Sequence, residues 1–303
     1  MAEFLQQLIN GLALGAIYAL IALGYTMVYG VLRFINFAHG DVFMLGAFAG
    51  YYLAPFVNRF LPVPSYLGGA IVLVLAMIIC AILGMTIEFL AYRPLRKRPK
   101  LTVLITAIGV SLFIEYTCQH EAVFGAAPHK FPDLIPTNTW HLGGVILNST
   151  QVIVFVTTLL LLGALTYIVK RTRVGTAMRA VAFNEQAAAL MGVNINSIIS
   201  FTFALGSALA AAGGILFAMN YASIEPLMGV TVGLKAFIAA VFGGIGNLPG
   251  AALGGIILGV VETFAGGIPG LSNYRDGIAF AILILVLLFR PAGLLGKSTV
   301  EKV

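Results

Sequence analysis

Long apolar runs separated by short polar connections make up most of this chain. A helix needs about 20 mostly apolar residues to cross a bilayer, and nine runs approach or exceed that length. The pattern predicts an all-α protein, a polytopic bundle of about nine transmembrane helices. Glycine is dense in the first, second, seventh and eighth runs, which leaves open that one of them is broken or re-entrant. The runs lie near residues 6–31, 37–57, 66–92, 101–118, 151–169, 196–219, 228–245, 248–266 and 275–290.

The composition supports a protein embedded in lipid. Of the 303 residues, 60% are hydrophobic and only 9% are charged, whereas soluble domains carry about 25% charged residues. The first ten residues, MAEFLQQLIN, contain no Lys or Arg, so we expect the first run to be a retained span and not a cleaved signal peptide. The net charge of +6 does not indicate a nucleic-acid partner, because the basic residues form short clusters between apolar runs.

These basic clusters predict how the bundle is oriented. Cytoplasmic loops carry an excess of Lys and Arg, and one set of alternate connections is much the richer. It contains Arg33, Arg93, Arg96, Lys97, Arg98, Lys100, Lys170, Arg171, Arg173, Arg179, Arg290, Lys297 and Lys302. The other set contains Arg59, Lys130 and Arg275. The bias places the N-terminus outside and the C-terminus inside, with a periplasmic loop at 119–150 and a cytoplasmic loop at 170–195.

The cytoplasmic loop has the pattern of one or two short amphipathic helices. A helix resting on lipid headgroups is an ordinary explanation for such a pattern. Five residues can share its apolar side: Ala177, Ala180, Val181, Ala188 and Met191.

Charges inside the apolar runs need an explanation, since each costs about 2.5–3.5 kcal/mol at the centre of a span. Lys235 lies in the seventh run and Glu262 in the eighth. In an antiparallel pair of spans both fall toward the outer side, so they can pair with each other or line a pathway. Alternatively, each snorkels to the interface. Glu88 and Glu115 lie near the ends of runs, and we expect them at the interface.

A polar cluster of Asn36, His39 and Asp41 follows the first run. It can be a hydrated cytoplasmic turn in which Asn and Asp cap the next helix. It can also be a partly unwound segment that lines a transport pathway. Four hydroxyl-bearing residues lead into it: Tyr18, Tyr25, Thr26 and Tyr29. Such hydroxyl groups can hydrate a pore, although Tyr also occurs in interfacial belts.

Glycines at four-residue spacing let helices approach closely in lipid. They predict close packing, and their density also suits helices that slide or rock. The pairs are Gly11/Gly15, Gly46/Gly50, Gly250/Gly254 and Gly255/Gly259.

Motifs typical of nucleotide-binding and catalytic sites are incomplete. The segment GLLGKST has Pro291 where a phosphate loop needs its first glycine. The segment GGIGNLPG has Pro249 where a dinucleotide fingerprint needs its third glycine. No Ser/His/Asp or metal-ligand spacing is evident. We therefore expect no catalytic residue, no metal and no cofactor on this chain.

Several segments together resemble the LivH-type permeases of branched-chain amino acid ABC transporters. They are NGLALGAIYALIALGYTMVYGVLRFINFAHGDVFMLGAF, YRPLRKRP, LKAFIAAVFGGIGNLPGAALGGIILGVVE and LFRPAGLLG. The similarity runs from about residue 5 to the C-terminus and is weakest in the loop 119–150. The resemblance implies one permease domain over 1–303 in a bacterial inner membrane. Its substrates would be leucine, isoleucine and valine, in some members with other amino acids.

The resemblance also implies partners. These are a homologous second permease of the LivM type, two ATPase subunits and a periplasmic amino-acid-binding protein. ATP and Mg would bind to the ATPase subunits, so this chain would transport without an ATPase site of its own. Importer permeases share a cytoplasmic E-A-A-x-x-x-G motif that docks on the ATPase, and here Gln replaces its glutamate. The implied coupling residues are Arg179, Glu185, Gln186, Ala187, Ala188 and Gly192.

The implied mechanism is alternating access without covalent chemistry. Nucleotide binding to the partners would move the helix at 175–192 and tilt the spans. The candidate pathway residues are Tyr18, Tyr25, Thr26, Asn36, His39, Asp41, Lys235 and Glu262. Three alternatives stay open: a related permease for urea or another small solute, a secondary transporter or channel that works alone, and a membrane-embedded enzyme, which the missing catalytic motif disfavours.

Overall fold

Each of the nine predicted runs coincides with a helix in the computed structural model, which describes residues 2–96, 98–268, 270, 272–290 and 292–296. These helices are α1 (Ala2–Leu32), α2 (His39–Val57), α3 (Tyr66–Ile87), α4 (Lys100–Gln119), α5 (Ser149–Arg171), α8 (Ile195–Tyr221), α9 (Met228–Gly243), α10 (Leu248–Gly267) and α11 (Arg275–Phe289). Within the described residues, eight helical segments are long and apolar enough to cross a membrane. The last of them, Ser272–Phe289, reaches this length only with the turn that precedes α11, and α9, with 16 residues, is too short to be counted.

The remaining elements are short. A π-helical turn, η1 (Glu88–Tyr92), and a 3-10 turn, η2 (Arg93–Leu95), continue α3, and a second 3-10 turn, η3 (Ser272–Tyr274), precedes α11. Two helices, α6 (Arg173–Phe183) and α7 (Glu185–Leu190), occupy the loop between α5 and α8. The strands are β1 (His129–Lys130), β2 (Thr139–Leu142), β3 (Val145–Asn148) and β4 (Ser223–Ile224), with β1 paired to β4 and β2 to β3, both antiparallel. The sequence did not predict these strands.

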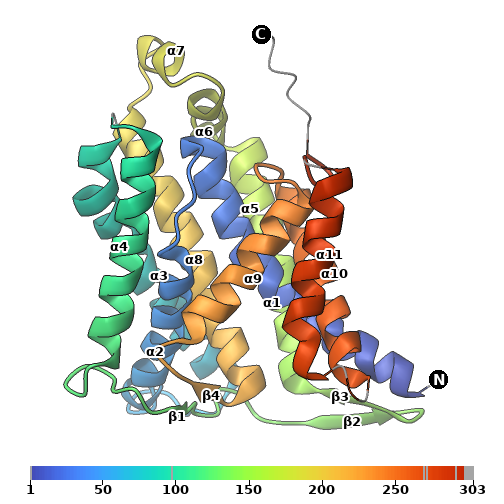
Figure 1. The fold of residues 1–303 in the computed structure, drawn as a ribbon. Coiled ribbons are helices and arrows are strands. Elements are labelled where there is room, and N and C mark those ends of the chain that lie inside the picture. The colour runs from blue at the N-terminus through green and yellow to red at the C-terminus, as the bar shows by residue number, and fades with distance from the viewer. Residues whose placement is uncertain (1, 97, 269, 271, 291, 297–303) are drawn as a thin grey trace.

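The two loops that were expected on opposite sides of the membrane lie at opposite ends of the bundle (Figure 1). The α6–α7 pair stands at one end, called here the α7 end, and the strands lie across the other, the strand end. The described residues of the predicted basic connections gather at the α7 end, where Arg33 contacts the carbonyl of Ala182 and Arg96 contacts Asn196. Lys97, Lys297 and Lys302 lie outside the described residues. The arrangement is therefore consistent with the predicted orientation, and it does not identify which end faces the cytoplasm.

Helix α1 lies at the centre of the bundle and is buried at Gly11 and from Ala13 to Val28. Its closest neighbour is α10, which crosses it through glycines. A Cβ atom on Gly15 would lie 2.6 Å from Ile256 Cα, and one on Gly11 would lie 2.8 Å from Val260 Cα. Close packing at the glycine pairs is confirmed, and the same device brings Gly46 of α2 against Ala211 of α8.

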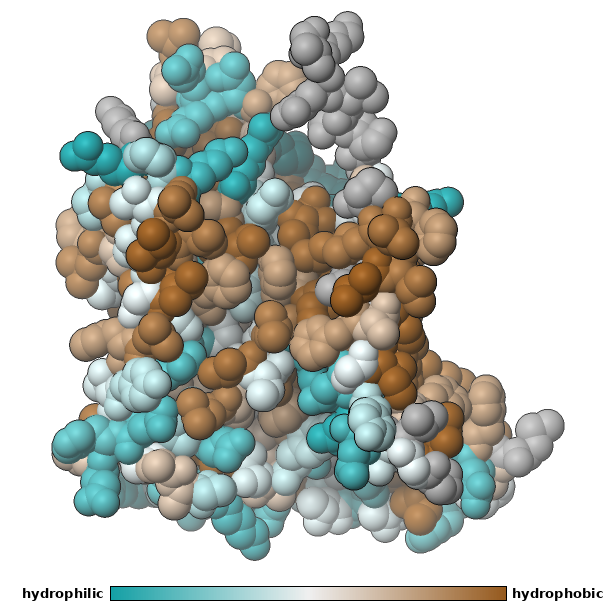
Figure 2. All heavy atoms as spheres, in the orientation of Figure 1, coloured by the Kyte–Doolittle hydropathy of each residue, from teal (hydrophilic) through white to brown (hydrophobic). Residues whose placement is uncertain are grey.

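The outward faces of the bundle are apolar. Helices α3, α4, α5 and α11 expose large hydrophobic side chains, among them Ile82, Phe113, Leu159 and Leu288. Figure 2 shows hydrophobic residues across the middle of the molecule, with hydrophilic residues gathered toward its two ends. Such a band is the surface that a bilayer covers, so the chain is a multi-pass membrane protein.

Helix α2 begins well inside the bundle. The chain leaves helical structure over residues 33–38 and turns back beside α1, so that the His39 ring packs on Gly24, about two turns before the end of α1. Gly24 leaves the space that this ring fills, since a Cβ on Gly24 would overlap the ring. The predicted second span starts two residues too early, because its first residues belong to this irregular segment.

Candidate functional site

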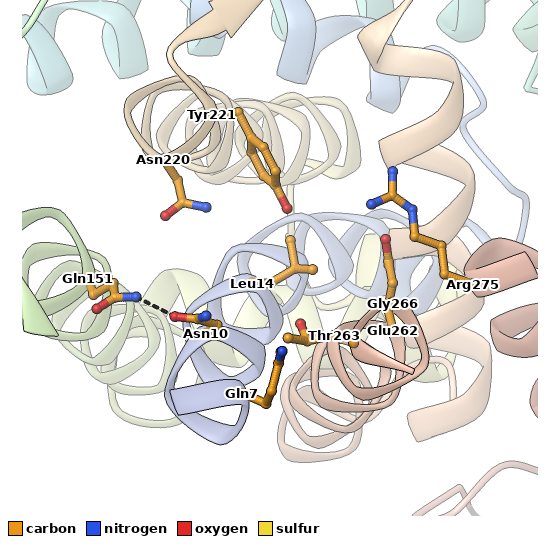
Figure 3. Close-up of a pocket in the computed structure, with 11 residues that line it drawn as sticks. Gln7, Asn10, Leu14, Gln151, Asn220, Tyr221, Glu262, Thr263, Gly266 and Arg275 are labelled. Carbon is orange, nitrogen blue, oxygen red and sulfur yellow. Dashed lines mark hydrogen bonds between the residues drawn. The ribbon is translucent and has the colours of Figure 1, made fainter. Parts of the chain in front are cut away.

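A polar cavity of about 420 Å³ lies near the strand end, between α1, α5, α8, α10 and α11. Figure 3 shows its side chains directed toward a common space from these separate helices. Its lining consists of Gln7, Asn10, Leu14, Gln151, Asn220, Tyr221, Glu262, Thr263, Gly266, Gly267 and Arg275. Small-molecule sites usually occupy about 300–1,000 Å³. The cavity is thus large enough for a small solute and far more polar than the rest of the bundle.

Glu262, which lines this cavity, belongs to a network of charged side chains behind it. Lys235 Nζ on α9 lies 2.7 Å from Glu262 Oε1 on α10 and 2.7 Å from Asp276 Oδ1 on α11. Tyr18 on α1 donates a 2.8 Å hydrogen bond to the other Glu262 oxygen. The predicted pairing of Lys235 with Glu262 is therefore present. Both residues are buried, so the alternative that each snorkels to the interface is wrong. The network connects four helices.

Amide side chains form the opposite wall. Gln151 of α5 donates to Asn10 of α1 at 2.8 Å, and Gln6 donates to the same Asn10 oxygen at 3.1 Å. Gln6 also exchanges two hydrogen bonds with the backbone of Ile146 in β3. The N-terminal part of α1 is therefore held against both α5 and the β2–β3 hairpin.

A second polar group surrounds the start of α2. The His39 ring lies edge-on to Tyr25 with 4.5 Å between ring centroids, and its Nε2 lies 3.2 Å from the Ile21 carbonyl oxygen. Asn36 accepts a 2.6 Å hydrogen bond from the Tyr92 hydroxyl. Asp41 accepts one of 2.5 Å from Ser111 of α4. This group ties α2 to α1, α3 and α4.

Two expectations about these acidic and amide residues are wrong. Asn36 and Asp41 do not cap α2, whose first residue follows Ala38 without a side-chain cap, and both are buried among neighbouring helices. Glu88 is not interfacial but fully buried, bound by Arg93, Arg96 and Ser200. Glu115 is also buried and accepts a hydrogen bond from Ser111. Partners distant in the sequence satisfy these groups, which is why position along a run misplaces them.

The predicted amphipathic helices are present as α6 and α7. Thr172 caps α6 by accepting from Gly175 N at 3.0 Å, and Asn184 caps α7 by accepting from Ala187 N at 2.9 Å. Gly192 ends α7 with a φ of +85°, as expected of a glycine after a helix. Bonds from Gly192 N to Ala189 O and from Val193 N to Ala188 O close this end.

The predicted coupling residues differ in their exposure to solvent. Arg179 contacts the Val169 carbonyl at the end of α5 and donates to Thr176. Ala188 is buried, whereas Glu185, Gln186 and Ala187 are exposed. Met191 is 85% exposed, so its predicted place on the apolar side is wrong: it follows the last residue of α7, where the chain already turns. Leu190 is 89% exposed.

The candidate pathway residues do not form one site. Tyr18, Lys235 and Glu262 meet at the polar cavity, while Tyr25, Asn36, His39 and Asp41 meet at the start of α2. Thr26 lines a separate cavity of about 120 Å³ near Arg179 at the α7 end.

Sequence reasoning missed most of the cavity lining. Gln7 and Asn10 are three residues apart on the first span, and Gln151 and Asn220 lie near the ends of theirs. Polar residues near a span end look interfacial when each is considered alone. Asp276, which completes the charge network, stands beside Arg275 in a connection that was read only for its basic residue. Among the described residues, no group of three or more His, Cys, Asp or Glu side chains could hold a metal ion.

Comparison with known proteins identifies the family. Residues 7–287 match the family described as branched-chain amino acid transport system / permease component. The chain belongs to this permease family. It is 45% identical to the high-affinity branched-chain amino acid transport system permease protein BraD of Pseudomonas aeruginosa, over 99% of this chain and 98% of that protein. It is 40% identical to the corresponding permease protein LivH of Escherichia coli, with the same coverage.

Membership of the permease family confirms the resemblance drawn from the sequence. The match covers the helices that build the cavity as well as α6 and α7. The probable branched-chain amino acid transport permease protein LivH of Methanocaldococcus jannaschii is 30% identical over 91% of this chain and 88% of that protein. Permeases are the membrane components of ABC transporters, and the apolar band of this chain agrees with that role.

Proposed function

We propose that this chain is a permease subunit of an ATP-driven importer that moves leucine, isoleucine and valine, together with other amino acids, into a bacterial cell. It spans the inner membrane with its N-terminus outside and its C-terminus inside. Its partners are a homologous second permease, two ATPase subunits and a periplasmic amino-acid-binding protein. The chain has no ATPase site of its own, and ATP with Mg binds to the partner ATPases.

The exposed apolar surface of α7 is the observation on which this proposal rests. Leu190 and Met191 are 89% and 85% exposed. They end and follow α7, which stands at one extremity of the bundle (Figure 1). Exposed apolar side chains outside the lipid-facing band indicate a contact with another protein. The ATPase subunits are the partners that the family provides at this end, with Glu185 and Gln186 beside the contact. Arg179, at the base of α6, would pass movement on to α5.

The positions of the polar cavity and of α7 support alternating access as the mechanism of this proposal. The polar cavity lies near the strand end and α7 at the other, so movement of α7 must cross the bundle to reach the cavity. The glycine-lined crossing of α1 and α10 brings the two backbones together without interlocking side chains. Such a surface lets one helix shift along another. Nucleotide can shift the equilibrium only through its different affinity for the two states.

Reconstitution of the four kinds of subunit in proteoliposomes tests this function. We expect leucine uptake that requires ATP and the binding protein. The variant Leu190→Glu should lower uptake about tenfold or more and reduce ATPase co-purification, because a buried unpaired charge in the contact is costly. Val123→Glu makes the same kind of change at an exposed residue of the strand end and serves as the matched control.

Three results would contradict the proposal. Uptake without ATPase subunits would indicate a self-sufficient carrier or channel. Uptake of urea with none of leucine would place the chain among related permeases for other solutes. Equal uptake by the two variants would show that α7 is not the ATPase contact.

A further inference from the structure

The charges at the polar cavity balance one another. Lys235 and Arg275 are positive, and Glu262 and Asp276 are negative, so their formal sum is zero. A partly buried site of this kind favours a solute without net charge, since an extra charge would be left uncompensated. A zwitterion adds one charge of each sign and preserves the balance.

Arg275 is the cation whose guanidinium keeps hydrogen-bond donors available for a solute. Its Nε lies 3.7 Å from Asp276 Oδ1, and within the described part of the chain its terminal nitrogens donate no hydrogen bond. Figure 3 shows the guanidinium turned toward the space beside Tyr221 and Glu262. A guanidinium binds a carboxylate through two parallel hydrogen bonds, and its half-exposed position leaves these donors accessible.

Glu262 is the anion that reaches the same space. Each of its oxygens accepts one hydrogen bond, from Lys235 and from Tyr18. A carboxylate offers about four lone-pair positions, so both oxygens can still accept from an ammonium group. The amides of Asn10 and Asn220 stand across the cavity as neutral partners.

We propose that this cavity binds the head group of an α-amino acid with an uncharged side chain, Arg275 taking the α-carboxylate and Glu262 the α-ammonium. The proposal rests on the proposed function, because it places the transported solute in the permease itself. Leu14 is the single aliphatic side chain in the lining. The cavity therefore recognises what leucine, isoleucine and valine share, and their side chains are selected elsewhere.

The variant Arg275→Gln tests the assignment in the complete reconstituted complex. We expect leucine uptake per ATP hydrolysed to fall about tenfold or more, as for loss of a hydrogen-bonded ion pair. Isoleucine and valine uptake should fall by the same factor. ATP hydrolysis stimulated by the binding protein should persist, with an unchanged concentration of binding protein for half-maximal stimulation. Arg59→Gln is the matched control, since Arg59 is exposed in the connection after α2.

The other outcomes distinguish failure of the proposed function from failure of this inference. If the unaltered complex lacks ATP-dependent uptake, the proposed function fails and this inference with it. If that complex transports and Arg275→Gln matches Arg59→Gln, the inference alone fails. A raised concentration of binding protein for half-maximal stimulation would show that Arg275 serves docking. A loss that differs among the three amino acids by more than about threefold, or about 0.7 kcal/mol, would show that the cavity selects side chains.

Discussion

Among single residues, those of the Lys235–Glu262 ion pair should be the most sensitive to mutation, because both partners are buried in an apolar bundle. We predict that Lys235→Met destabilises the protein by about 3–5 kcal/mol, since it leaves a carboxylate buried without its cation. Thermal unfolding of the purified protein in detergent, followed by loss of monodispersity, measures this effect. Transport should fall as well, because Glu262 forms the wall of the cavity.

Two further variants separate charge from packing at this position. Lys170→Met removes an exposed Lys from the end of α5 and should leave stability unchanged. The double variant Lys235→Met with Glu262→Gln removes the uncompensated carboxylate and should recover much of the lost stability. If it is as unstable as Lys235→Met alone, lost packing and not an unpaired charge explains the defect.

At the scale of secondary-structure elements, the tightest described packing of α1 is its crossing with α10. We predict that Gly15→Leu destabilises the protein by about 3 kcal/mol, near the upper end of the usual range for overpacking. The reason is that the new Cβ would meet backbone atoms of Ile256, which cannot rotate away as a side chain can. The yield of folded protein in the membrane fraction and its unfolding temperature check this prediction.

Gly163→Leu is the control for this change. Gly163 also lies inside a long apolar helix, α5, but a Cβ there meets nothing within 4 Å. Its replacement should therefore be tolerated. Equal loss in both variants would mean that leucine disturbs insertion and that the helix crossing is not the sensitive feature.

The helices could be predicted from sequence because membrane insertion leaves a strong, local pattern. Apolar runs located all nine, and the caps at Thr172 and Asn184 lie within the loop that was expected to be helical. The start of α2 was placed less well, because the His39 ring fits a space left by Gly24 on another helix. The glycine spacings predicted close packing but could not say which helices meet.

The candidate site was predicted only in part, for a related reason. Lys235 and Glu262 stood out because charge is rare in such runs, and 27 residues separate them. The partners of Glu88 include Ser200, which is 112 residues away, and Gln151 is 141 residues from Asn10. The sequence around an Asn or Gln near the end of a span does not show that its side chain meets others in a cavity. Only the folded bundle shows that five helices bring them to one cavity.

At the scale of the whole molecule, the proposal depends on which side of the membrane each end faces. The basic connections gather with α6 and α7, and cytoplasmic loops carry such an excess of Lys and Arg. The strand end holds Arg59, Lys130 and Arg275, together with the polar cavity. If this bias sets the orientation, the cavity receives solute from outside while α7 contacts a cytosolic ATPase.

Cysteine labelling in intact cells tests this orientation. Native Cys80 and Cys118 are both buried, so they should react little. We predict that Trp140→Cys in β2 reacts with a membrane-impermeant maleimide from outside, and that Met191→Cys after α7 reacts only once the membrane is opened. Both side chains are well exposed, which removes burial as an explanation for a difference. If Met191→Cys reacts in intact cells, no cytosolic ATPase could reach α7, and a carrier that works without ATPases would become the better account of the chain.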